Sequence, residues 1–153
     1  MSDTLDHAML SKYGLDNTRD YYRTQVEAVE LVRRLILDEA IDSHIVGNAE
    51  VDIACSAKGF RHMRNHVEFQ SSKLGLAASI IKKDEVSEVY FNSPLQHGGS
   101  VLRPTFGLHP LRYVRGLALA AENHGAQIYS RSEVKEWNTD GQVHLLNTIG
   151  GSV

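Results

Sequence analysis

Apolar side chains recur every three or four residues over residues 16–40, which is the period of an amphipathic helix. The positions that share this period are Tyr22, Val26, Val29, Val32 and Ile36. Charged residues fill most of the complementary positions, and Asp16 or Asn17 can accept hydrogen bonds from the first free backbone N–H groups. The pattern predicts a long helix that packs one face on a core.

The same period predicts further helices on both sides of this one. Three of them are followed directly by a glycine, which tolerates the left-handed conformation of a helix end, and the last begins after a proline suited to a first turn. These helices are expected over residues 3–13, 57–74, 83–89 and 111–124.

Short apolar or alternating runs predict strands between and after the helices. They fall at residues 45–47, 51–54, 127–129, 133–137 and 143–147. Residues 76–81 form a brief apolar run, and residues 94–104 are extended with a kink at Gly98-Gly99. Asp140-Gly141 favours a hairpin turn. Helices mixed with short strands and antiparallel turns predict an α+β fold, with helices on a small mixed or antiparallel sheet, in a single domain over residues 1–153.

Composition limits the partners of this domain. The 153 residues are 42% hydrophobic and 23% charged, which suffices for one globular core, and the net charge of −3 provides no basic field for nucleic acid. The N-terminus is too polar for a signal peptide, and no run of about 18 apolar residues indicates a membrane span. The only cysteine, Cys55, excludes an internal disulfide and suits a reducing compartment. We expect a cytoplasmic protein with Cys55 in its core.

Local motifs indicate no reaction by themselves. No G-x-G-x-x-G phosphate loop is present, and the glycine pairs at residues 98–99 and 150–151 are typical of turns. His62 and His66 have the four-residue spacing at which two imidazoles can face one metal, but no third ligand accompanies them. A solvated helix face explains the pair better, so we expect no metal site. No serine lies in a G-x-S-x-G elbow, and Cys55 has no neighbouring histidine.

A longer pattern begins at residue 98. A glycine-containing strand leads to a proline, a helix that ends in Gly-Ala, another strand and a valine that opens a hairpin. These features are Gly98-Gly99, Pro104 with His109-Pro110, residues 111–124, Gly125-Ala126, residues 128–130 and Val134. This order resembles the FAD-dependent oxidoreductases of the D-amino-acid oxidase, glycine oxidase and sarcosine oxidase family. His109-Pro110-Leu111 is similar to the gamma-glutamylputrescine oxidoreductase-like branch. The last 55 residues or so carry the resemblance, and residues 1–97 fit it in layout.

The resemblance implies an activity for a larger enzyme. In this family a hydride passes from a C–N bond of an amine or amino acid to the flavin, and the protein positions the substrate. The chain would be the substrate-domain segment, with the family's phosphate fingerprint expected upstream of residue 1. We therefore expect it to be inactive by itself and not to retain FAD, and to form homo-oligomers through the apolar surface left exposed.

The resemblance also implies site residues. Val134 matches a valine whose backbone contacts the adenine part of FAD. His97, Arg103 and His109 match positions near the flavin ring and are candidates for substrate contacts, since an arginine can bind a carboxylate through two parallel hydrogen bonds. No catalytic residue is indicated. The alternative is a self-contained, non-catalytic interaction domain with the same element order. Residues 148–153 favour the first reading, because they resemble the family's return to its flavin domain.

Overall fold

The computed structural model describes residues 3–153 and has the α+β fold that the sequence predicts. In chain order its elements are α1 (Asp3–Asp38), β1 (Glu50–Ile53), α2 (Ala57–Leu74), β2 (Ala77–Ile81), α3 (Lys83–Val89), β3 (Gly99–Arg103), α4 (Pro110–Asn123), β4 (Val134–Asp140), β5 (Val143–Thr148) and β6 (Gly151–Ser152). The strands form two separate antiparallel sheets, ordered β1-β3-β2 and β4-β5-β6.

Helix α1 contains the two helices expected before and after Gly14. Gly14 has φ 78° and ψ 171°, so the helical path breaks there, and the Thr18 hydroxyl donates to the Gly14 carbonyl at 2.7 Å. Beyond the break, the buried side chain of Tyr22 packs with Leu74 and Leu76. The predicted periodicity therefore places the correct face of α1 on the core.

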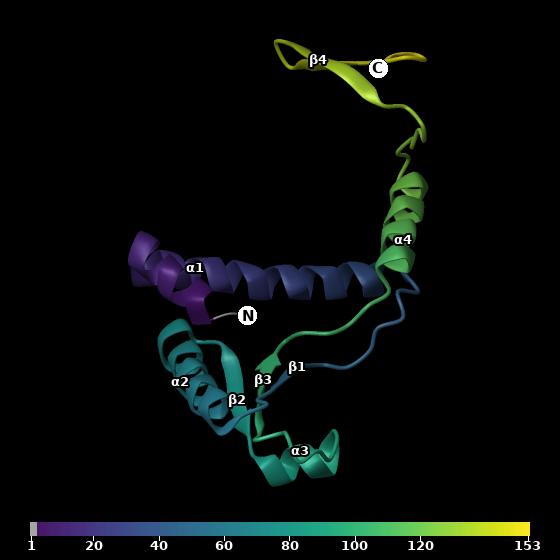
Figure 1. Ribbon diagram of the computed structural model, residues 1–153. Helices are drawn as coiled ribbons and strands as arrows, with labels where there is room; N and C mark the ends of the chain where they lie inside the picture. The colour runs from purple at the N-terminus through teal and green to yellow at the C-terminus, as the bar shows by residue number, and fades with distance from the viewer. Residues whose placement is uncertain (1–2) are drawn as a thin grey trace.

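The first sheet has helices on both of its faces. Strand β3 is central, with Val101 opposite Val51 on β1 and Ser79 on β2. On the face that carries Val101, Ile81 and Val101 pack with Val86 of α3 in a buried cluster. Leu102 points to the other face and joins the cluster of α1 and α2. Helix α2 lies along this sheet with α1 above it (Figure 1).

The second sheet lies at the far end of the molecule, and α4 leads to it from the first sheet (Figure 1). Its hairpin turns at Gly141, as Asp140-Gly141 predicts. Every residue of β4 is exposed. No helix among the described residues could cross a membrane.

Two predicted strands are wrong. Residues 127–129 form none, because no neighbouring strand among the described residues supplies the hydrogen bonds that a ladder needs. Residues 45–47 contribute only the isolated bridge between Val46 and Gly107. Apolar content alone therefore overestimates strands where tertiary partners are missing.

Candidate functional site

One candidate residue lies near each end of strand β3. It pairs on both sides, and Gly99 allows β1 to approach closely, because a Cβ there would lie 2.5 Å from the Asp52 carbonyl oxygen. His97 precedes the strand and Arg103 ends it. At about 3.3 Å per residue, the strand alone separates the two ends by about 13 Å. The structure therefore does not bring His97 and Arg103 together.

His97 is half-buried in a rigid turn. Its backbone N–H donates to the Ala54 carbonyl at 2.9 Å. The preceding Gln96 is 1% exposed, and its side-chain amide donates to the Lys83 carbonyl and the Ser87 hydroxyl, both at 2.9 Å, while its carbonyl accepts from Gly98 N–H at 2.9 Å. Gln96 thus fixes the position of His97. The sequence did not single out Gln96, since a glutamine in a polar loop carries no pattern.

Arg103 is exposed at the end of β3, opposite Ala77 of β2, and is joined to Pro104 by a cis peptide bond. It lines a pocket of about 60 Å³ whose other walls come from α1 and the following turn. On the sheet, Arg103 and Ser79 share the face opposite α2, and both are exposed. A guanidinium there is accessible to a carboxylate-bearing ligand.

His109 has a structural role at the start of α4. It is the N-cap residue, and its Nδ1 accepts from the Arg112 backbone N–H at 3.5 Å. Its own backbone N–H donates to the Ser43 carbonyl at 2.8 Å. Pro110 follows at the first helical position, as the sequence predicts.

Val134 begins β4, which pairs only with β5 and is therefore an edge of its sheet. Val134 lies opposite Thr148 and is 48% exposed, and the register shifts between Val134 and Glu136. An edge strand leaves alternate backbone N–H and C=O groups without a strand partner. Polar backbone groups along this edge are open to a ligand.

Cys55, His62 and His66 lie beside or within α2. Cys55 is exposed, so its predicted place in the core is wrong: it lies just before the N-cap Ser56 of α2, outside the sheet. His62 is exposed as expected, but His66 is half-buried and lines a 20 Å³ cavity against β1 and β3. Among the described residues, no group of three or more His, Cys, Asp or Glu side chains could hold a metal ion.

The family model for FAD dependent oxidoreductases matches residues 6–153 of the chain. The chain belongs to this family. No curated protein matches the chain. Among solved structures, the chain is similar to glycine oxidase from Geobacillus kaustophilus, with a TM-score of 0.68 and 23% identity over 84% of this chain and 35% of that one.

Two further structures have the same fold. Glycine oxidase from Bacillus cereus aligns with a TM-score of 0.66 and 20% identity, over 91% of this chain and 37% of its own. L-proline dehydrogenase from P. horikoshii aligns with a TM-score of 0.63 and 20% identity, over 90% and 36%. The chain thus spans little more than a third of the length of the structures it resembles.

The described residues could contact part of FAD, the cofactor of this family. The open edge of β4 at Val134 can offer backbone donors and acceptors of the kind that an adenine ring needs. The 153 residues contain no glycine-rich loop of the kind that holds a dinucleotide's phosphates. The 153 residues therefore offer a candidate contact for adenine and no glycine-rich loop for the pyrophosphate.

Proposed function

We propose that this chain is the substrate-domain segment, a single domain, of an FAD-dependent oxidoreductase that acts on the C–N bond of an amine or amino acid. The family match over residues 6–153 carries the proposal. The likeness to two glycine oxidases and an L-proline dehydrogenase supports the substrate class, since their names denote enzymes of amino acids. His109-Pro110-Leu111 supports the finer placement in the gamma-glutamylputrescine oxidoreductase-like branch.

Each candidate residue has a part in this proposal. The backbone of Val134 holds the adenine end of FAD, which when bound supplies the acceptor for the substrate's hydride. Arg103, exposed on the sheet face opposite α2, binds a substrate carboxylate. His97 is the second candidate for a substrate contact, because its turn is held rigidly by Gln96. His109 acts on the substrate only indirectly, by starting α4.

The proposal also covers the partner of the enzyme and its cellular compartment. Its partner is a small-molecule amine or amino acid rather than nucleic acid or a membrane, and its compartment is the cytoplasm. The mild net charge of −3 and the reducing environment suited to the free Cys55 support this setting.

Titration with FAD tests whether the segment functions alone. The purified 153-residue chain should be colourless and should bind FAD more weakly than about 10 μM, because the phosphate contacts worth much of the ~7 kcal/mol at that affinity have no residues here. Calorimetry or flavin fluorescence measures the affinity. Saturable binding tighter than that value would show a complete cofactor site within residues 1–153.

A test of the proposed reaction requires a flavin-loaded polypeptide that carries this segment. Its flavin should lose its oxidised absorbance when amino acids or amines are added without oxygen, and Arg103→Gln should raise the KM for amino acids about tenfold while affecting simple amines little. A holoenzyme whose flavin no amine or amino acid reduces would refute the proposed reaction.

A further inference from the structure

A cleft with cationic walls lies where α1 meets the C-terminal end of α2. Its volume of about 480 Å³ is within the range of small-molecule sites. The lining residues are Arg19, Arg23 and Val26 of α1 with Ser72, Lys73, Leu74, Gly75 and Leu76. Every ionisable side chain among them is a cation. This cleft shares Val26 and Leu76 with the smaller pocket that Arg103 lines, but Arg103 itself does not line it.

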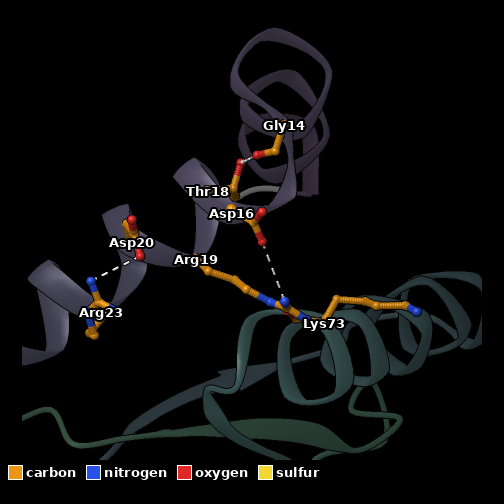
Figure 2. A network of polar contacts seen from close by, with 7 residues as sticks. All are labelled: Gly14, Asp16, Thr18, Arg19, Asp20, Arg23 and Lys73. Carbon is orange, nitrogen blue, oxygen red and sulfur yellow. Dashed lines mark hydrogen bonds and ion pairs between the residues drawn. The ribbon is translucent and has the colours of Figure 1, made fainter.

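Arg19 is held in place by a contact between the two helices. Its Nε donates to the Lys73 carbonyl at 2.5 Å, and Figure 2 shows the guanidinium reaching across from α1 to the end of α2. Its Nη1 lies 3.8 Å from the Asp16 carboxylate, beyond hydrogen-bond distance. The outer edge of a positioned guanidinium thus remains able to bind a carboxylate through two hydrogen bonds.

The acidic neighbours compete weakly for these cations. Asp16 is 95% exposed. Arg23 pairs with Asp20 at 3.0 Å and with Glu27 at 3.8 Å, and these two carboxylates are 60% and 68% exposed. Ion pairs so open to water contribute little. The helix dipole places a partial negative charge, about half an elementary charge, at the C-terminal end of α2. The charges of Arg19 and Arg23 exceed it. The Lys73 side chain extends away from Arg19 (Figure 2), so its charge acts at longer range.

Apolar side chains form the rest of the wall. Leu74 and Leu76 are buried in the cluster with Tyr22, and Val26 packs against that cluster. We propose that this cleft binds an organic carboxylate with an apolar body: Arg19 receives the carboxylate, Arg23 adds charge, and the apolar body lies against Val26 and Leu76. The site involves no flavin and does not depend on the proposed function.

Titration with hexanoate tests the proposal on the 153-residue chain. In two-dimensional ¹H–¹⁵N spectra, the amide signals of Gly75 and Leu76 should shift saturably with hexanoate in the millimolar range, whereas hexylamine, with the same apolar chain and opposite charge, should leave them unmoved. No saturable shift up to about 10 mM, or equal shifts with hexylamine, would overturn the proposal.

Two variants and one control variant test whether the hexanoate carboxylate binds at Arg19 and Arg23. Arg19→Gln keeps a donor for the Lys73 carbonyl but loses the charge and the second hydrogen bond, so hexanoate should bind about tenfold more weakly. Arg23→Gln, which leaves the contact between α1 and α2 intact, should weaken binding about threefold. Arg34→Gln is the control, because Arg34 is exposed on α1 outside the cleft, and its affinity should change less than twofold. If Arg34→Gln weakens binding as much as the other two, or if Arg23→Gln leaves it unchanged, the cleft is not the site.

Discussion

At Gly98 and Gly99, atoms of neighbouring elements lie so close to the backbone that a side chain would clash with them. A Cβ on Gly98 would lie 2.6 Å from the Phe60 ring, and Gly98 also has φ +111°. A Cβ on Gly99 would lie 2.5 Å from the Asp52 carbonyl oxygen. The sequence predicted a kink at this pair within an extended run, and the family resemblance implied a glycine-containing strand; Gly99 begins the central strand. The reason is tertiary: the crowding comes from α2, β1 and Ile81 of β2, which are all distant from this pair in the sequence.

Gly99→Ala should therefore lower the free energy of unfolding by about 1–3 kcal/mol, because the opposing backbone of β1 cannot move without disturbing its ladder. Urea denaturation measures the loss. Gly150→Ala is a matched control, since a Cβ there meets only the Thr148 hydroxyl, at 3.9 Å. The control should change stability by about 0.5 kcal/mol or less. An equally stable Gly99→Ala variant would contradict the close packing of β1 and β3.

His62 and His66 should respond differently to truncation. His62→Ala should change stability by about 0.5 kcal/mol or less because the side chain is exposed, whereas His66→Ala should cost about 1–2 kcal/mol through packing lost between α2 and the sheet. Thermal melts with and without zinc also test the metal site. A rise in Tm with zinc, removed by either substitution, would restore the histidine pair as ligands.

Among whole elements, the helices agree best with the sequence. The bounds of α2 and α3 are those predicted, because amphipathic period, capping residues and Gly75 all act locally. The strands agree less well, since residues 127–129 lack a partner and β3 occupies only part of the extended run over residues 94–104. Of the candidate site, Arg103 could be found from the family pattern, but the arrangement around Gln96 depends on contacts that no local pattern encodes.

The Gln96 side chain joins α3 to the start of β3 through its hydrogen bonds to Lys83, Ser87 and Gly98. Gln96→Leu should cost about 2–4 kcal/mol, because the buried Gly98 N–H and the part-buried Lys83 carbonyl lose the hydrogen bonds that the Gln96 side chain makes. Gln142→Leu in the exposed β4–β5 turn is the control, with an expected change of about 0.5 kcal/mol or less. Guanidinium denaturation compares the two. Similar stabilities would mean that α3 does not depend on this hydrogen-bond network.

The edge strand β4 allows a test of the cofactor contact. In the 153-residue chain, Val134→Ala should cost about 0.5 kcal/mol rather than the 1–3 kcal/mol of a buried valine, because half of the side chain is already exposed. In a flavin-loaded polypeptide that carries this segment, Val134→Pro should weaken FAD binding more than Val134→Ala, since proline removes the backbone N–H. Circular dichroism confirms that the proline variant is folded. A folded Val134→Pro protein with unchanged FAD affinity would exclude Val134 from the site.

Across the whole molecule, large apolar side chains are exposed along α4 and the second sheet. They include Leu111, Val114, Leu119, Trp137, Val143, Leu145 and Ile149, each at least 45% exposed. Soluble monomers rarely leave contiguous apolar patches of more than a few hundred Å² uncovered. These elements extend away from the first sheet (Figure 1), so the surface they present is long. The isolated chain is therefore expected to cover it by association.

The 153-residue chain should accordingly sediment as oligomers at high concentration and bind the apolar dye 8-anilinonaphthalene-1-sulfonate. Replacing Trp137 and Val143 together by serine removes two of the most exposed apolar groups of the second sheet, so both association and dye fluorescence should fall. Asn138→Ser on the same hairpin is the control and should change neither. A monomer that binds no dye would instead support a self-contained domain, since its apolar side chains would then be tolerated in water without any covering surface.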